Sequence, residues 1–306
     1  MTVDTPTLSY VLTTRNRLPM LRVTLARLIE NRRDDEEIVV ADGASTDGTT
    51  EYLHELAAAG AIDEVISAPD HGEAHGLNRG FLRACGELIK VVSDDDAYYW
   101  PGVKACREFM LDHPGIDVLG SNGGATNPEL DEKFGVGEFQ DWFLRWRDDH
   151  RSFQFCGLGI MVRRSSLPLV GLFNPAFVRV DMEFALRVTQ GPARLAWHLG
   201  YDWLRIGHDQ SSGVVQLRRL AHEARYEAVH AGTDTVEPHS VNLTARRLRA
   251  RAGDLRRSLR RGAAPPAGPE RQILRTSDGI DAWLETFACA ERWLAEANQK
   301  PLGFLS

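Results

Sequence analysis

The chain has 306 residues, of which 43% are hydrophobic, and its formal net charge is -7. This length provides for one substantial hydrophobic core and an appended subdomain. The lack of net positive charge argues against nucleic acid as a partner, because the overall composition does not attract phosphates. The four cysteines form no C-x-x-C pair, which suggests neither a zinc site nor a disulfide framework and favours a cytoplasmic protein. No apolar run approaches membrane-spanning length and the N-terminus does not resemble a secretory signal, so any membrane association would be peripheral, at the inner face.

The first part of the chain alternates short strand-like runs with longer helix-like segments, which is typical of a parallel α/β sheet. The pattern predicts strands at 7–14, 37–41, 63–68, 87–92 and 116–121, and helices at 19–32, 49–60, 73–85 and 101–113. Four or five β-α units in succession indicate a nucleotide-binding type of α/β layer.

The second part is less regular. Residues 122–155 read as an excursion that leaves the sheet, 155–167 as a returning strand, and 180–191 as a helix with an acidic N-cap. Beyond residue 209 we expect long Arg-rich helices over 213–262, a linker at 262–270 and a final amphipathic helix at 280–297.

Three consecutive carboxylates, Asp94, Asp95 and Asp96, follow the apolar strand that ends at Val92. In open α/β sheets ligands bind outside the carboxyl ends of the strands. Hard cations such as Mg²⁺ or Mn²⁺ prefer carboxylate oxygens and bridge to phosphates. The alternative is a solvated turn whose last aspartate caps the next helix.

Two further segments point to the same crevice. Asp42 ends a strand in "ADGASTDGT" (41–49), where it is placed to accept hydrogen bonds from a base or ribose; the alternative is a tight turn with an N-cap. Small residues at Gly72, Gly76 and Gly80 allow a phosphate to approach the start of a helix, or they only allow close packing of that helix on the sheet.

In this order and spacing, the segments resemble family 2 glycosyltransferases of the GT-A fold. The resemblance runs from about residue 7 to 210 and rests on "SYVLTTRNR" (9–17), "ADGASTDGT" (41–49), "GEAHGLNRG" (72–80), the D-x-D-like "SDDDAYY" (93–99), "GLGIMVRRSSLPLVGLFNPAF" (157–177) and "VDMEFALRV" (180–188). It implies a GT-A domain over 1–210, with a nucleotide-sugar half at 1–121 and an acceptor half at 122–210, followed by a helical region at 211–306.

The resemblance also implies a reaction and a set of site residues. The reaction is an inverting transfer, dependent on Mg²⁺ or Mn²⁺, from a UDP- or dTDP-sugar, with GDP next, to an acceptor hydroxyl or amine. Carried over by position, Asp181 is the general base, and Asp96 and His208 lie at the metal. Asp42 contacts the nucleobase, and Asp94 and Asp95 lie at the ribose or in the metal shell. The other residues of the nucleotide site are Thr14, Arg15, Arg17 and Asn78.

The sequence departs from the family pattern at several positions. Val180 stands where the family usually has Glu, and Glu183 lies two residues after the expected base. Leu77 replaces an arginine that often contacts phosphate, a role that Arg79 or Arg17 would take over. The candidate acceptor residues are Glu183 and two tryptophans able to stack on a sugar or an apolar aglycone, Trp142 and Trp146.

Other functions compete with this interpretation. A sugar-phosphate nucleotidyltransferase would carry a Gly-rich loop after the first strand, whereas "TTRNRLP" (13–19) has no glycine. A binding protein that has lost catalysis would not need Asp181. The acceptor class stays open between a saccharide, a lipid-linked saccharide and a natural-product aglycone.

The Arg-rich segment 241–261 has one narrow apolar stripe at helical spacing. Such a stripe packs on the catalytic domain, forms a homodimer seam or lies on an anionic membrane. We favour packing or dimerisation, because the stripe is too thin for strong membrane insertion.

Overall fold

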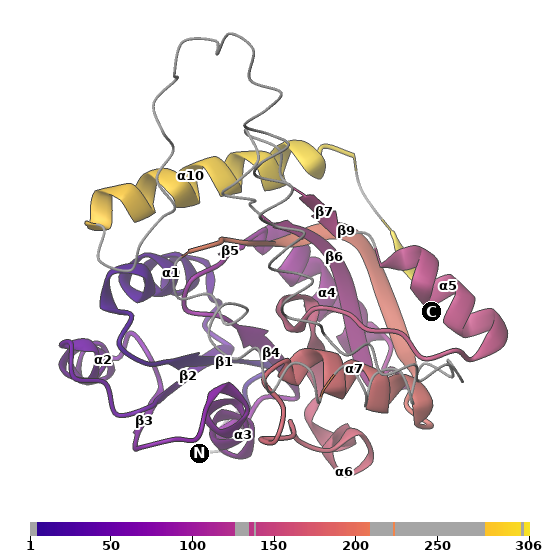
Figure 1. Cartoon of the computed structure of the whole chain (residues 1–306), viewed down its shortest axis with the longest axis horizontal. Helices are drawn as coiled ribbons and strands as arrows, with labels where there is room; N and C mark the ends of the chain where they lie inside the picture. Colours follow the sequence, from indigo (N-terminus) through magenta and orange to yellow (C-terminus); the bar gives the residue numbers. More distant parts are fainter. Residues whose placement is uncertain (1–4, 126–134, 138, 209–222, 224–278, 301–302) are drawn as a thin grey trace, which may run out of the picture.

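The computed structural model describes residues 5–125, 135–137, 139–208, 223, 279–300 and 303–306 (Figure 1). The Arg-rich segment 241–261, the linker at 262–270 and almost all of the helices expected over 213–262 lie outside these residues.

The strands are β1 (Leu8–Thr14), β2 (Glu36–Asp42), β3 (Glu64–Ser67), β4 (Leu88–Val92), β5 (Ala97–Tyr98), β6 (Val118–Ala125), β7 (Gly135–Gly137), β8 (Met161–Arg163), β9 (Leu195–Arg205) and β10 (Phe304–Leu305). The α-helices are α1 (Leu18–Asn31), α2 (Thr49–Ala58), α3 (Glu73–Arg83), α4 (Trp100–Asp112), α5 (Gln140–Asp149), α6 (Leu167–Val170), α7 (Val180–Gln190) and α10 (Ile280–Ala297), with 3₁₀ turns η1 (Gly157–Gly159) and η2 (Arg164–Ser166).

The strands form one mixed sheet in the order β10-β9-β6-β8-β4-β1-β2-β3. β1 pairs in parallel with both β2 and β4, and β2 pairs in parallel with β3. β8 runs antiparallel to its neighbours β4 and β6, while β6 and β9 are parallel. The expected α/β sheet flanked by helices is therefore confirmed. Four of its strands, β4, β1, β2 and β3, are parallel to one another.

The two faces of the sheet are covered by different helices because side chains of a strand alternate between faces. In β1, Leu8, Tyr10 and Leu12 pack with buried residues of α1 and α4. Val11, between them, packs on the opposite face with buried residues of α3 and α7. The crossover helices thus bury both faces, as expected for parallel strands.

The second half of the chain differs from the sequence prediction. β6 continues to Ala125 and α5 forms within the expected excursion 122–155. The expected strand over 155–167 shortens to β8, and β9 was not predicted. β9 also explains two glycines of β6: a Cβ at Gly120 would lie 2.2 Å from the ring of Trp197, and one at Gly123 would lie 2.2 Å from the ring of Trp203. The sheet therefore continues where the local pattern is irregular.

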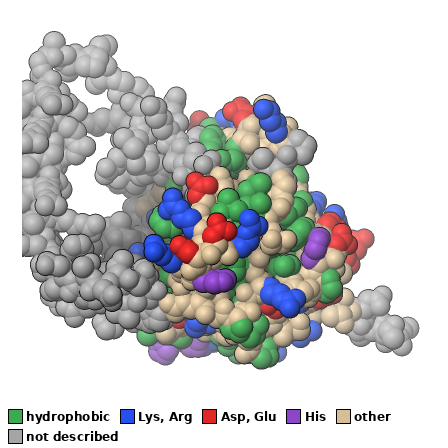
Figure 2. All heavy atoms as spheres, turned by 90° about the vertical axis from the view of Figure 1, so that its right-hand side faces the viewer, with side chains coloured by type: hydrophobic (Ala, Val, Ile, Leu, Met, Phe, Trp, Pro, Cys, Tyr) green, Lys and Arg blue, Asp and Glu red, His purple; other side chains and the backbone are tan. Residues whose placement is uncertain are grey.

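The described surface carries charged side chains of both signs (Figure 2). Within the described part of the chain, no helix is long and apolar enough to cross a membrane. On the face shown in Figure 2, Lys and Arg side chains are interspersed with Asp and Glu and do not gather into one basic patch among the coloured residues. The described residues of the face in Figure 2 therefore offer phosphates no continuous positive surface.

Candidate active site

The carboxylate triplet lies where two adjacent parallel strands end. β4 leads into Asp94 and Asp95, and β1 leads into Arg17, the N-cap residue of α1. Arg17 Nη1 donates to Asp94 Oδ1 at 2.9 Å and to Asp95 Oδ2 at 2.7 Å. The charge of Asp94 raises the pKa of Arg17, against the opposing effect of burial, so the guanidinium stays charged. The guanidinium of Arg17 therefore bridges the carboxylates of Asp94 and Asp95.

Asp95 also contacts a histidine from a distant segment. His208, which follows β9, places Nε2 2.8 Å from Asp95 Oδ2. Burial alone would raise the pKa of Asp95, but the hydrogen bond from His208 and the charge of Arg17 outweigh it and lower the pKa. Asp95 is thus held as a carboxylate between Arg17 and His208.

Asp96 points away from this pair. Its Oδ2 accepts a hydrogen bond from Ser93 Oγ and its Oδ1 accepts one from the backbone N–H of Ile206, both at 2.7 Å. Burial, followed by the charge of Asp95, raises the pKa of Asp96. Asp94, Asp95 and Asp96 are only 3%, 9% and 6% exposed, so the alternative of a solvated turn is wrong.

The chemistry of these groups fits a divalent cation. Carboxylate oxygens and an imidazole nitrogen are ligands that Mn²⁺ accepts, and Mg²⁺ also prefers carboxylate oxygens. Asp94 Oδ2 is buried without a hydrogen bond of normal length among the described residues, and the group that interacts with this carboxyl, the Thr14 hydroxyl, also lacks one. A buried acceptor without a partner costs free energy, and a cation would relieve that cost.

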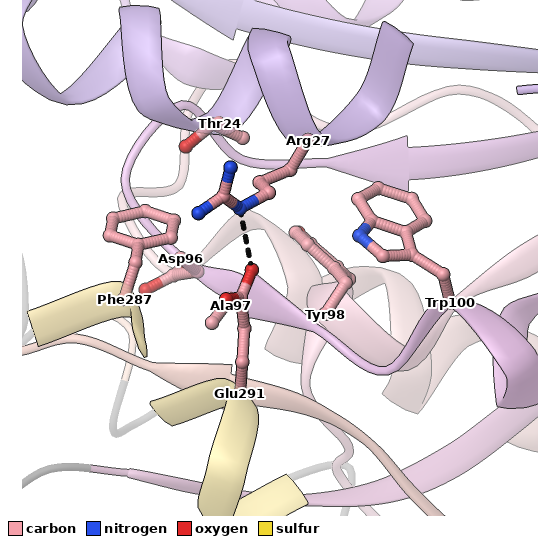
Figure 3. Close-up of a pocket in the computed structure, with 8 residues that line it drawn as sticks. All are labelled: Thr24, Arg27, Asp96, Ala97, Tyr98, Trp100, Phe287 and Glu291. Carbon is pink, nitrogen blue, oxygen red and sulfur yellow. Dashed lines mark hydrogen bonds and ion pairs between the residues drawn. The ribbon is translucent and has the colours of Figure 1, made fainter. Parts of the chain in front are cut away.

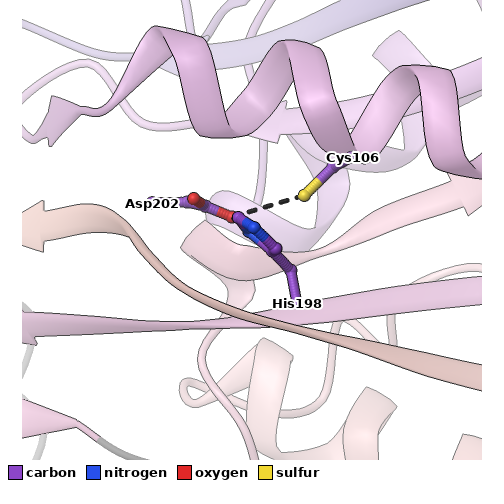
Figure 4. Close-up of side chains that lie close together, drawn as sticks. All are labelled: Cys106, His198 and Asp202. Atoms are coloured by element: carbon purple, nitrogen blue, oxygen red, sulfur yellow. Dashed lines mark hydrogen bonds and ion pairs between the residues drawn. The ribbon is translucent and has the colours of Figure 1, made fainter. Parts of the chain in front are cut away.

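A separate cluster combines a cysteine, a histidine and an aspartate (Figure 4). Asp202 Oδ2 lies 2.7 Å from His198 Nδ1 and accepts a hydrogen bond from Cys106 Sγ at 3.3 Å. Burial and the charge of Asp202 raise the pKa of Cys106, which favours the thiol over the thiolate that a metal requires. We interpret this cluster as a buried hydrogen-bond network that fixes α4 on β9.

Asp181 lies in the first turn of α7, after the N-cap residue Arg179. The expected acidic N-cap is therefore wrong, because the carboxylate bonds to other groups. Asp181 Oδ2 accepts a hydrogen bond from the backbone N–H of Gly157 at 2.9 Å, and Oδ1 accepts one from Met182 N–H. The side chain remains partly exposed. η1 thus orients a carboxylate that still reaches solvent.

Glu73, at the start of α3, links Asp181 with the triplet. Burial, followed by the charges of Asp181 and Asp95, raises the pKa of Glu73. The side chain reaches solvent, so the two neighbouring carboxylates are the main physical cause of this direction. Asp181, Asp95 and Glu73 are therefore close enough to interact electrostatically.

Asp42 does not present a free carboxylate to a base. It is 1% exposed and accepts hydrogen bonds from Ser45 N–H and Oγ, Thr50 Oγ1 and Ser67 Oγ. These bonds occupy the acceptor positions of a carboxylate. The role of base contact predicted for Asp42 is corrected to that of organising the turn after β2.

Asn78 and the glycines of α3 have packing roles. Both groups of the Asn78 amide pair with the backbone of Phe173, at 2.8 and 2.9 Å. A Cβ at Gly80 would lie 2.3 Å from Val11, and one at Gly76 would lie 2.9 Å from Thr13. Close helix-sheet packing therefore explains Gly76 and Gly80, and Asn78 ties α3 to the loop after α6. Its contact with nucleotide stays a prediction.

The remaining nucleotide candidates differ in availability. Arg79 donates to the carbonyls of Ala68 and Pro69 at 2.8 Å, so it does not replace the arginine missing at Leu77. Thr14 ends β1 with a buried hydroxyl that has no hydrogen-bond partner among the described residues. Arg15 is exposed beside this strand end. Thr14, Arg15 and Arg17 remain the residues at the crevice.

The residues expected to bind the acceptor differ in exposure and in hydrogen bonding. Trp142 is 53% exposed on α5 and Arg145 stacks on its ring. Trp146 is partly buried against the core, and its Nε1 donates to Thr189 O at 2.7 Å. Glu183 is 3% exposed and pairs with Arg187 at 2.9 Å. We therefore correct Glu183 to a structural role, because its carboxylate is buried and paired inside the protein. The acceptor contacts of Trp142 and Trp146 stay predictions.

The Glu183–Arg187 pair gives a stability prediction. Arg187 also donates to the carbonyls of Val170 and Leu172, so removal of Glu183 disturbs the contact between α7 and the α6 loop. We expect Glu183→Ala to lower the free energy of unfolding by about 2 kcal/mol, measured by urea denaturation. The exposed Glu55→Ala on α2 is the control and should change it by less than about 0.5 kcal/mol. Equal effects of the two changes would contradict a structural role for Glu183.

Sequence reasoning missed Glu223, which lies 2% exposed against the start of α7. Its Oε1 accepts from Val178 N–H at 2.6 Å and its Oε2 from Arg179 N–H at 3.2 Å. These are the two residues before α7, so a carboxylate more than 40 positions along the chain anchors the helix of Asp181. A single Glu within the Arg-rich sequence 213–262 carries no local signal for this role.

An α/β sheet with carboxylates gathered at the carboxyl ends of its strands is typical of nucleotide-binding α/β proteins. Residues 9–167, just over half of the chain, match glycosyl transferase family 2, and the chain belongs to that family. The protein is therefore a glycosyltransferase, as the sequence predicted.

Two solved structures have a similar fold. The mannosyltransferase PcManGT from Pyrobaculum calidifontis, in complex with GDP-Man and Mn²⁺, is 19% identical; the match covers 95% of this chain and 88% of that one, with a TM-score of 0.57. Residues 1–349 of TarS from S. aureus, in complex with UDP-GlcNAc, are 16% identical; the match covers 76% of this chain and 68% of that one, with a TM-score of 0.56. At these identities the likeness establishes the GT-A fold.

Proposed function

We propose that this glycosyltransferase moves a sugar from a nucleoside-diphosphate donor to an acceptor hydroxyl or amine, with inversion at the anomeric carbon. The observation that carries the proposal is the attachment of Asp181 to η1: its Oδ2 accepts a hydrogen bond from Gly157 N–H at 2.9 Å. η1 leads into Ile160, whose carbonyl accepts from Val91 N–H of β4, the strand that ends at the triplet. A single displacement needs a base beside the acceptor and a site for the leaving diphosphate. Asp181 is placed for the base, and Asp95 would provide the site for the diphosphate through a bound divalent ion.

Asp181 is the proposed general base. It would take the proton from the acceptor oxygen as that oxygen attacks the sugar. Its bonds to Gly157 N–H and Met182 N–H hold the carboxylate in one orientation and leave further lone pairs for the proton. Held in this way, Asp181 needs no reorientation when the acceptor binds.

Asp95 and His208 are the proposed residues for the divalent ion, Mg²⁺ or Mn²⁺, because they are already in contact. The ion, when bound, neutralises charge on the departing diphosphate. The sequence assigned this role to Asp96, whose oxygens hold the loop to Ser93 and Ile206 in the structure. Two asparagine variants, described in the Discussion, distinguish these assignments.

Removal of the Arg17 side chain is expected to raise the affinity for the metal ion and to lower the affinity for nucleotide. Its guanidinium neutralises Asp94 and Asp95, so it competes with a cation, but it is also a suitable partner for a diphosphate. We expect Arg17→Met to bind Mn²⁺ alone several-fold more tightly than wild type and nucleotide on the order of tenfold more weakly. Isothermal calorimetry measures both affinities. Weaker Mn²⁺ binding by Arg17→Met would contradict the competition.

The donor is tested by thermal stability with UDP, dTDP and GDP, each with and without Mn²⁺. A ligand that binds only the folded protein raises the Tm by mass action. We expect one nucleotide to give a metal-dependent increase of roughly 5 °C at about 100 times its Kd. No increase with any of the three, with or without Mn²⁺, would overturn the proposed function.

Release of nucleoside diphosphate from the matching sugar donor separates a transferase from an inactive binding protein. We expect release to depend on Mn²⁺ and to accelerate with the correct acceptor, whether a saccharide, a lipid-linked saccharide or an aglycone. Release of pyrophosphate from a nucleoside triphosphate would indicate the alternative, a nucleotidyltransferase. The cytoplasmic location and the homodimer stay predictions, and the Arg-rich segment proposed for the dimer lies outside the described residues.

A further inference from the structure

Helix α10 lies across α1 and above β5 (Figure 1). Its buried face consists of Trp283, Phe287, Ala290 and Leu294, which share one apolar cluster with Met20 and Val23 of α1, Ala97 of β5, and Leu204 and Ile206 at the end of β9. Arg27 of α1 also pairs with Glu291 of α10 at 2.9 Å (Figure 3). A helix more than 180 positions after the triplet is thus fixed to the elements around it.

The elements beneath α10 carry the proposed metal loop. Ala97 directly follows Asp96, and Ile206 donates its backbone N–H to Asp96 Oδ1. Phe287 and Asp96 line the same small pocket between α1 and α10 (Figure 3). The apolar face of α10 therefore packs on the residues that hold the loop in shape.

Trp283 contacts the histidine itself. Its ring centroid lies 5.8 Å from that of His208, with an angle of 70° between the ring planes, which is an edge-to-face contact. The side chain of His208 is 0% exposed, and Trp283 is also 0% exposed. His208 is thus buried in contact both with the ring of Trp283 and, through its Nε2, with Asp95.

We propose that Trp283 is a positioning residue for the metal site: it holds the imidazole of His208 against Asp95. α10 then belongs to the catalytic unit. This inference rests on the proposed function, because His208 is assigned there to the metal. Trp283 acts through His208, so its loss matters for metal binding only while His208 is present.

The indole nitrogen of Trp283 allows a conservative variant to be chosen. Trp283 Nε1 is buried without a hydrogen-bond partner among the described residues. A buried donor without a partner is unfavourable, so a purely apolar ring would serve packing at least as well. Trp283→Phe should consequently keep the fold while leaving a gap beside His208, because the phenyl ring is smaller.

The test measures binding of Mn²⁺ alone by electron paramagnetic resonance on the full chain. We expect Trp283→Leu to weaken binding about tenfold and Trp283→Phe about threefold, since a freed imidazole must be reordered when the ion binds. Trp293→Leu is the matched control: Trp293 is on the same helix but packs on Tyr201 at 5.9 Å between ring centroids. It should bind Mn²⁺ like the wild type.

A double-mutant cycle distinguishes positioning from general destabilisation. In the His208→Asn background, Trp283→Leu should cause no further loss of Mn²⁺ affinity. Wild-type affinity in folded Trp283→Leu, or an equal loss in both backgrounds, would overturn the inference. If Trp283→Leu does not fold, Trp283→Phe decides by the same criteria. No Mn²⁺ binding by the wild type, with or without nucleotide, would instead overturn the proposed function and the inference with it.

Discussion

Replacing Asp181 with asparagine is expected to lower the rate of sugar transfer by about 10³-fold, within the range for loss of a general base. Asparagine has nearly the same shape, and its carbonyl oxygen can still accept the hydrogen bond from Gly157 N–H. The amide has no basic oxygen to take the acceptor proton. The measurement is release of nucleoside diphosphate from the donor that the thermal panel identifies.

Binding should be unaffected in this variant. The increase in Tm with nucleotide and Mn²⁺ should equal that of the wild type, because the base acts on the acceptor. Asp141→Asn, which changes an exposed carboxylate on α5, is the matched control and should keep full activity. More than about one tenth of wild-type activity in Asp181→Asn would show that another group is the base, and Glu73 would then be tested next.

The second large effect is expected at the metal loop, where two neighbouring carboxylates are compared. Asp95→Asn should weaken Mn²⁺ binding on the order of 100-fold, because the amide lacks the charge that holds a cation beside His208. Asp96→Asn should weaken it about tenfold or less, because an amide oxygen can still accept from Ile206 N–H and keep the loop in shape. Calorimetry with Mn²⁺ measures both.

A larger loss of Mn²⁺ affinity in Asp96→Asn than in Asp95→Asn would change the assignment. If Asp96→Asn causes the larger loss while both variants remain folded, Asp96 is the ligand that the sequence predicted, and its bonds to Ser93 and Ile206 are exchanged for the ion. If neither variant loses affinity, the loop does not bind the metal. Comparing Tm values without metal controls for the fold, since Asp96 is the more enclosed of the two carboxylates.

The different roles of Asp95 and Asp96 show the limit of a sequence motif. Neighbouring residues of one type are equivalent in the sequence, yet Asp95 contacts Arg17 and His208 whereas Asp96 contacts Ser93 and Ile206. His208 and Ile206 are more than 100 positions from the triplet. Which carboxylate is open to a ligand depends on the end of β9, and β9 itself was not predicted.

The same limit applies to Asp42, Asn78 and Glu183. Each matches a position or a type expected in a site, but each has its polar atoms bound inside the protein. The partners of Asp42 and Asn78 include Ser67 and Phe173, on other elements. A sequence shows that a side chain is able to bind a ligand, but it does not show that another part of the chain already occupies it.

By itself, the sequence determined the family, the alternation of β1 to α4, the position of the triplet after β4 and the helix that carries Asp181. These features follow from local periodicity and from motif spacing, which neighbouring residues encode. Tertiary structure alone decided the antiparallel strands on the far side of the sheet, the place of α5 and β9, the pairing of Asp95 with His208 and the packing of α10 over it. The physical reason is that these contacts join segments far apart in the chain, and their free energy comes from burial and hydrogen bonds that exist only after the sheet has assembled.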